Sequence, residues 1–117
     1  MSKYKFGLQM HAVREDFAEN PAETLKKVAA MGYNGVEFHY PALNRSAEEY
    51  KQMLEEAGIA CYGTLVSWPD LQPDKLADTM EKHRKIGTNK IIIGSVQPKV
   101  LDSEPDMPKK VVAYMNE

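Results

Sequence analysis

The sequence alternates short apolar segments with amphipathic helices, and this alternation constrains the fold more than any other feature. The strand-like segments begin near Lys5, Asn34, Ile59 and Lys90, at intervals of about 25–31 residues. Strands that alternate with helices of this length form βαβ crossovers, which build a parallel sheet. The sequence therefore predicts an α/β fold made of parallel (β/α) units.

Signals at the helix ends mark three complete helices between these strands. The first is expected to open at Asn20 with Glu23 three residues later, and the second at Ser46 with Glu49 three residues later. Both patterns are typical of a capping box. The third helix is expected to open at Pro73, because proline suits the first helical turn. Each of the three is expected to stop at a glycine, and these glycines are Gly32, Gly58 and Gly87.

Two parallel α/β folds fit this alternation. A flavodoxin-like receiver fold closes with five strands in about this length, whereas a TIM barrel uses eight strands in about 250 residues. A receiver would have acidic residues after its first and third strands, where this sequence has Met10-His11-Ala12 and Leu65-Val66-Ser67. A long connection over 95–107 leads to an amphipathic segment over 109–117, and no fifth strand follows. We therefore expect residues 1–117 to form a single partial domain, the first four strands and N-terminal half of a (β/α)8 barrel.

The composition excludes several classes of function. The formal net charge is −2, so no basic surface for nucleic acid is expected. No apolar run approaches the roughly 18 residues of a membrane helix, and the N-terminus lacks the apolar core of a signal peptide. The one cysteine, Cys61, is expected to be a buried structural thiol. We expect a cytoplasmic protein without nucleic-acid or membrane partners.

Polar side chains gather at the carboxyl ends of the first two predicted strands, where parallel α/β proteins form their sites. The alternation of apolar and polar residues predicts that Gln9, His11, Glu37 and His39 face the barrel interior or its mouth. Glu37 would be costly to bury without a partner, so it is either a substrate group or part of an internal ion pair or hydrogen bond. His11, His39 and Glu37 are candidate metal ligands, but two histidines without a defined spacing are equally consistent with loop residues or with groups that bind substrate hydroxyls.

The loops after the strands contain further candidates. Trp68 suits the apolar face of a sugar or could cap the core, and Tyr40 and Pro41 are equally ambiguous. Arg14 could bind a phosphate or carboxylate, or pair with a neighbouring acidic side chain. Gly94-Ser95 after the fourth strand is a weak indication of phosphate binding.

Six segments, taken in order, carry a resemblance to a known family: GLQMHAVREDF, TLKKVAAMGY, GVEF, SAEEYKQMLEEAGI, GTLVSW and IGTNKIIIG. Together they resemble the opening of the xylose-isomerase-like TIM-barrel family, the sugar and sugar phosphate isomerases and epimerases. The resemblance covers nearly the whole chain, and no single segment is diagnostic. The sequence departs from the family pattern at Leu65, where many relatives have histidine, and at Gly94-Ser95, where relatives often have proline or an aromatic residue.

The resemblance implies the N-terminal portion of a metal-dependent sugar or sugar phosphate isomerase or epimerase. Its chemistry would be proton abstraction next to a carbonyl, with a metal stabilising the enediolate. In the family, carboxylates and histidine on later strands hold the divalent metal (Mn, Mg, Co or Zn), so residues 1–117 are expected to hold none and to be inactive alone. By position, the substrate end of the pocket would be lined by Gln9, His11, Glu37, His39, Ser67 and Trp68.

Two other functions fit the sequence. One is a non-catalytic half-barrel that self-associates or binds a partner, and the other is a degenerate sugar-binding barrel. A half-barrel leaves its first and fourth strands as open edges, so self-association through these edges is expected. The fold also occurs in apurinic endonucleases, but the acidic balance argues against DNA as a partner.

Overall fold

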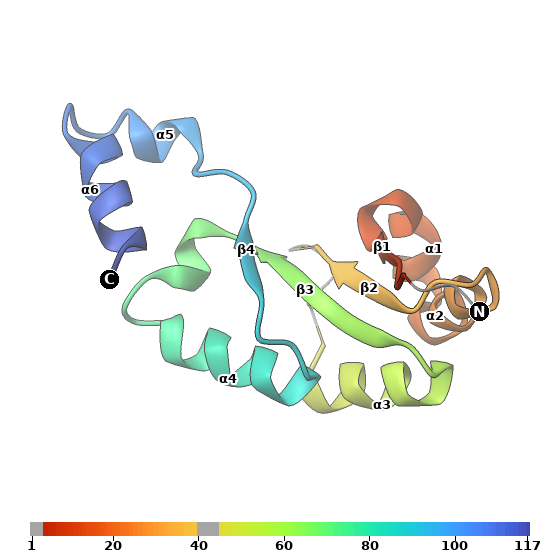
Figure 1. Cartoon of the computed structure of the whole chain (residues 1–117). Helices are drawn as coiled ribbons and strands as arrows, with labels where there is room; N and C mark the ends of the chain where they lie inside the picture. The colour runs from red at the N-terminus through yellow and green to blue at the C-terminus, as the bar shows by residue number, and fades with distance from the viewer. Residues whose placement is uncertain (1–3, 40–44) are drawn as a thin grey trace.

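The computed structural model describes residues 4–39 and 45–117 as parallel strands alternating with helices (Figure 1). The strands are β1 (Gly7–Gln9), β2 (Gly35–Phe38), β3 (Ala60–Val66) and β4 (Ile91–Ile93). All pairings are parallel, and the order in the sheet is β1-β2-β3-β4. This sequential order confirms the expected topology and excludes the flavodoxin-like order, in which β1 lies between β2 and β3.

The helices connect successive strands. Their bounds are η1 (Met10–Val13), α1 (Arg14–Glu19), α2 (Pro21–Ala30), α3 (Ala47–Ala57), η3 (Trp68–Leu71), α4 (Leu76–Ile86), α5 (Pro98–Leu101) and α6 (Met107–Met115). The expectation that the third long helix opens at Pro73 is wrong, because α4 begins at Leu76. The preceding residues instead form the short helix η3 and a turn in which Lys75 donates its backbone N–H to the carbonyl of Gln72 over 2.9 Å.

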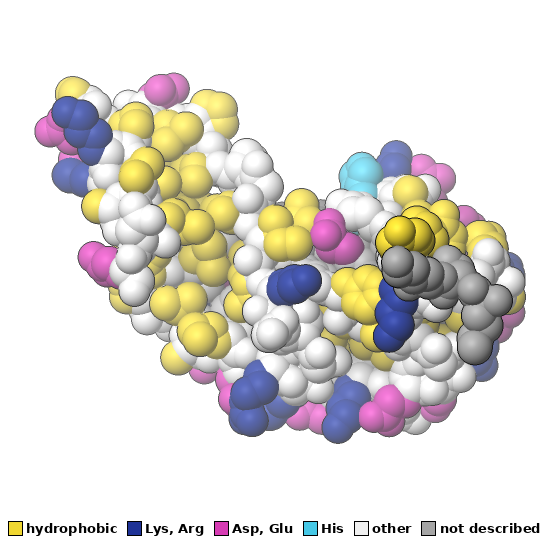
Figure 2. Space-filling model, viewed as in Figure 1, with side chains coloured by type: hydrophobic (Ala, Val, Ile, Leu, Met, Phe, Trp, Pro, Cys, Tyr) yellow, Lys and Arg dark blue, Asp and Glu magenta, His cyan; other side chains and the backbone are white. Residues whose placement is uncertain are grey.

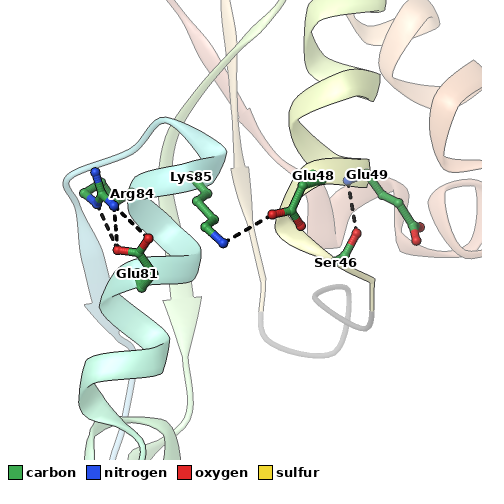
Figure 3. Close-up of polar contacts among 6 residues, drawn as sticks. All are labelled: Ser46, Glu48, Glu49, Glu81, Arg84 and Lys85. Carbon is green, nitrogen blue, oxygen red and sulfur yellow. Dashed lines mark hydrogen bonds and ion pairs between the residues drawn. The ribbon is translucent and has the colours of Figure 1, made fainter.

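The caps of α2 and α3 form as the sequence predicts. The side chain of Asn20 accepts a hydrogen bond from the backbone N–H of Glu23, and Ser46 accepts one from Glu49 (Figure 3). Each bond satisfies one of the backbone donors that a helix leaves unpaired at its start. Gly58 ends α3 with φ +67°, a left-handed conformation that favours glycine.

The hydrophobic core lies between one face of the sheet and the helices of the first two units. Val36 and Phe38 of β2 are fully buried in this core, whereas Glu37 between them is only half-buried. This alternation confirms the predicted phase of the strand, with apolar side chains facing the helices and Glu37 facing the opposite, inner face of the sheet. The remaining core includes Met10, Phe17, Leu25, Val28, Tyr50 and Leu54.

The ring of Tyr62 lies over the inner face of the sheet, close to the first residues of β1 and β2. A Cβ atom on Gly35 would lie 2.4 Å from the Tyr62 ring, and one on Gly7 would lie 2.8 Å from it. The two glycines of β1 and β2 therefore provide the space in which this ring lies across the sheet.

The ends of the sheet differ in their surroundings. Figure 1 shows α3 and α4 along one side of the sheet and the α5–α6 arm extending from β4 away from it. The molecule is elongated, with principal extents of 50 × 28 × 26 Å. Across the described ranges, no further strand pairs with the outer edges of β1 and β4. Helix α4 is joined to α3 by an exposed ion pair between Lys85 and Glu48 at 3.3 Å (Figure 3), which contributes little to stability in water.

No helix in residues 4–39 and 45–117 is both long enough and apolar enough to span a membrane.

Candidate functional site

A pocket of about 430 Å³ lies at the carboxyl ends of the strands. It is lined by Gln9, His11, His39, Leu65, Val66, Ser67, Trp68, Gly94, Ser95 and Gln97. These residues follow or end all four strands, and they meet because parallel strands bring their carboxyl ends to one edge of the sheet. Five of the six residues expected to bind substrate line the pocket, and the sixth, Glu37, does not.

The first wall of the pocket is shaped by the end of β1. The side-chain oxygen of Gln9 accepts a hydrogen bond from the backbone N–H of His11 over 2.7 Å, and this bond caps the short helix η1. The cap ends the strand at Gln9 and turns the chain at Met10, whose side chain enters the core. His11 is thereby held at the rim of the pocket, and the amide nitrogen of Gln9 stays available as a donor.

His11 and His39 form the centre of this wall. Their rings meet edge to face, with centroids 5.0 Å apart and planes at 89°. His39 is only 8% exposed, and its Nδ1 has no hydrogen-bond partner in the part of the chain that the structure describes. Burial lowers the pKa of His39 from its ordinary value, and the nearby His11 and Arg14 lower it further. His39 is therefore neutral at pH 7, and no bond at Nδ1 fixes which nitrogen holds its proton.

Arg14 stands beside this pair at the start of α1. Its guanidinium donates a hydrogen bond to the carbonyl of His11 over 3.1 Å. The neighbouring Glu15 approaches the guanidinium only to 4.0 Å and is 91% exposed. A surface pair at this distance is weak, so Arg14 keeps unused donors near the histidines.

The second wall is formed by the segment after β3. Ser67 donates both its backbone N–H and its hydroxyl to Asp70 Oδ2, over 3.0 Å and 2.6 Å, and these bonds cap η3. The Asp70 carboxylate is thus occupied by the backbone of its own turn. Trp68 follows at the first position of η3, and its ring packs against Tyr114 of α6. Tyr114 was not predicted as part of this wall, because its contact with Trp68 joins residues far apart in the chain.

Glu37 lies deeper in the sheet than the pocket. Its neighbours in register are Gln9 of β1 and Gly63 of β3. It forms no hydrogen bond or ion pair with any described residue, and it lies outside the pocket lining. Gln97 lines the pocket but was not singled out in the sequence, where only its place after the fourth strand indicates a role. Tyr40 and Pro41 lie outside the described residues.

The described residues do not bring the candidate metal ligands His11, His39 and Glu37 together as a divalent-metal site. Within residues 4–39 and 45–117, no three histidine, cysteine, aspartate or glutamate side chains gather closely enough to hold a metal ion. His11 and His39 meet without a carboxylate beside them, and no carboxylate lines the pocket. The donor set is therefore suited to hydrogen bonding rather than to holding a hard divalent cation.

No protein-family model and no curated protein matches the sequence. Among solved structures, the chain matches the crystal structure of a sugar phosphate isomerase/epimerase from Parabacteroides distasonis ATCC 8503, with a TM-score of 0.71 and 17% sequence identity. The match covers 99% of this chain and 46% of that chain, so this chain spans about half the length of the structure it matches. The four strands and their helices therefore have the fold of about half of a TIM-barrel isomerase, as the sequence resemblance implied.

Proposed function

We propose that this chain forms the substrate-binding end of an isomerase or epimerase acting on sugars or sugar phosphates. The observation that carries the proposal is the pocket at the carboxyl ends of the four strands, which combines an aromatic wall with several hydrogen-bonding groups. Ligands of parallel α/β folds bind at this end of the sheet. The half-barrel fold shared with a sugar phosphate isomerase/epimerase supports the same substrate class.

The pocket offers a sugar both kinds of contact that it needs. Trp68 presents a large apolar ring against which the C–H face of a sugar can pack. Gln9 and Gln97 carry amide groups that donate to and accept from hydroxyls, and neutral His39 can do either. A polyol can therefore be bound without a charged partner in the pocket.

The reaction of such an enzyme moves a proton between carbons next to a carbonyl, which requires an acid–base group and stabilisation of the developing oxyanion. The described pocket residues bind and orient the substrate but include no carboxylate. We therefore expect the 117-residue chain alone to bind sugars without isomerase or epimerase turnover. Incubation with ketoses, their phosphates and manganese, magnesium or cobalt tests this. Metal-dependent turnover that disappears in Glu37→Gln would contradict it.

Sugar binding itself is measured through Trp68, the only tryptophan in the chain. Titration with a ketohexose, its phosphate and a cyclic polyol should give saturable changes in intrinsic fluorescence. Gln9→Ala should weaken binding several-fold because it removes a hydrogen-bonding amide from the pocket and the cap of η1. The matched control is Gln52→Ala on α3, whose amide bonds only to Glu56 on an exposed helix face. The proposal fails if none of the ligands binds saturably.

A further inference from the structure

We propose that this pocket takes a phosphorylated sugar, with the phosphoryl group held by the imidazoles of His11 and His39 and the guanidinium of Arg14. This inference rests on the proposed function and identifies which of its two substrate classes the site selects. The argument draws on the geometry of the histidine pair, the charges around it and the opposite wall of the pocket.

The geometry of the pair suits a tetrahedral anion. The two rings stand at right angles with centroids 5.0 Å apart, so their N–H groups can reach different oxygens of one phosphoryl group. His39 is more than nine-tenths buried, yet its Nδ1 has no hydrogen-bond partner among residues 4–39 and 45–117. A buried polar atom without a partner is costly, so the ring has hydrogen-bonding capacity that these described residues do not use.

The charges around the pair favour an anion over a cation. The charged groups that act on His39 are His11 of η1 and Arg14 of α1, and both disfavour its protonated form. No carboxylate is among the described residues that line the pocket, and Arg14 stands beside this lining, bonded to the carbonyl of His11. Figure 2 shows a histidine side chain beside Lys or Arg and Asp or Glu side chains at this rim of the molecule, over the β1–α1 region, where Glu15 lies 4.0 Å from Arg14. A phosphoryl group would offset this effect of His11 and Arg14 and favour the protonated form of His39.

The opposite wall of the pocket leaves room for the sugar part of the ligand. Gly94 and Ser95 after β4 are small, and Ser95 adds a hydroxyl. A Cβ on Gly94 would come within 3.3 Å of Leu65, so glycine keeps this side of the pocket open. The sugar body then lies between Trp68 and this wall, with its phosphoryl group toward the histidines.

The affinity of this site for a phosphorylated sugar should depend on pH. A bound phosphoryl dianion favours the protonated form of His39, whereas His11 and Arg14 disfavour that form in the free protein. Binding therefore takes up a proton, and the affinity for the phosphorylated sugar should fall as pH rises from about 6.5 to about 8, a range in which the phosphate is largely dianionic. The affinity for the unphosphorylated sugar should change little over the same range.

The test compares a ketohexose with its phosphate, using the fluorescence of Trp68 in the full chain. At about pH 6.5 we expect the phosphate to bind about tenfold more tightly, a preference typical of charge-assisted hydrogen bonds. Arg14→Gln and His11→Gln should each reduce this preference several-fold. Arg84→Gln removes the same charge from an exposed site on α4 and is the matched control.

A second measurement follows His39 directly by nuclear magnetic resonance with inorganic phosphate as the probe. We expect phosphate to raise the pKa of His39 in the wild-type chain and to raise it less in Arg14→Gln. Equal affinity for both sugars, or no response of His39 to phosphate, overturns the phosphoryl site and leaves the proposed function standing. Failure of both sugars to bind overturns both.

Discussion

The rings of Trp68 and Tyr114 meet edge to face, with centroids 5.6 Å apart and planes at 76°. The hydroxyl of Tyr114 also donates a hydrogen bond to the carbonyl of Leu71, at the end of η3. One side chain of α6 therefore contacts both ends of the short helix that forms a wall of the pocket. Trp68 is held in place by a residue that does not itself line the pocket.

This contact predicts graded effects of two substitutions. Tyr114→Phe removes the hydrogen bond and should lower the free energy of unfolding by about 0.5–1.5 kcal/mol. Tyr114→Ala also removes the aromatic contact, worth about a further 0.5–1.5 kcal/mol, and should shift the Trp68 emission to longer wavelength as the indole becomes wetter. Urea denaturation measures the first effect and fluorescence the second. Met115→Ala, on the same helix and 48% exposed, is the control. Identical stability of both Tyr114 variants and wild type would contradict the prediction.

Gly35→Ala should destabilise the protein through the ring of Tyr62. The new Cβ would lie 2.4 Å from this ring, so the ring or the strand must move, at a cost of about 1–3 kcal/mol. Gly94→Ala is a matched control with a smaller expected effect, because its Cβ meets only the end of the Leu65 side chain at 3.3 Å. In a Tyr62→Ala background, the cost of Gly35→Ala should nearly vanish. Thermal melts of the wild type, the two single variants and the double variant measure how strongly the Gly35 and Tyr62 substitutions are coupled in stability. Full additivity of the two effects would exclude the clash.

The stability of the chain should fall between about pH 7 and about pH 5 because of His39. Its pKa in the folded protein is below the ordinary value of 6.5, so the unfolded chain binds more protons in this range. Stability is therefore highest above about pH 7 and decreases as His39 is forced to protonate. The pKa values of Glu48 and Glu81 are also lowered, from an ordinary value of 4.5. These two carboxylates therefore change the pH dependence of stability only at more acidic pH. Denaturation of wild type and His39→Gln across this range should show a weaker pH dependence for the variant, and parallel curves would refute the assignment.

We also propose that the chain self-associates through the open side of its sheet. The outer edges of β1 and β4 pair with no other described strand, and Ile92 of the edge strand β4 is only half-buried, with its side chain close to Gly63. Light scattering should show a mass that rises with concentration. Ile92→Lys should reduce this association, whereas Val112→Lys, on an exposed position of α6, should not. A monomer at high concentration with a sharp cooperative melt would contradict the proposal.

The fold was predictable where its signals are local. Helix α3 begins with the Ser46–Glu49 hydrogen bond and ends at left-handed Gly58, and each of these features lies within a few residues of the end that it marks. Helix α1 was missed because Val13 provides no side-chain cap and the helix has only 6 residues, fewer than two turns. The start of α4 was misplaced because Asp70 draws the preceding residues into η3, and its bonds to Ser67 depend on a turn that no periodicity indicates.

The candidate site was predictable in part for a different reason. In a parallel sheet, residues that follow each strand must meet at one edge, so Gln9, His39 and Ser67 were expected together from strand positions alone. Glu37 was expected with them, but it lies within β2, opposite Gly63, and among the described residues in this part of the chain only His39, which follows β2, lines the pocket. The edge-to-face arrangement of the two histidines and the contact of Tyr114 with Trp68 depend on side-chain packing between distant segments, which alternation along one strand does not encode.

The pocket is assembled from residues that span most of the chain, from Gln9 at the end of β1 to Gln97 before α5. A ligand bound there favours the folded chain over the unfolded one, because the unfolded chain cannot bring these residues together. At a ligand concentration one hundred times its dissociation constant, this linkage adds about 2.7 kcal/mol to the free energy of unfolding. A rise in melting temperature across a panel of sugars and sugar phosphates would therefore rank their affinities without any assay of turnover, and amide exchange should slow together in β1 and β4.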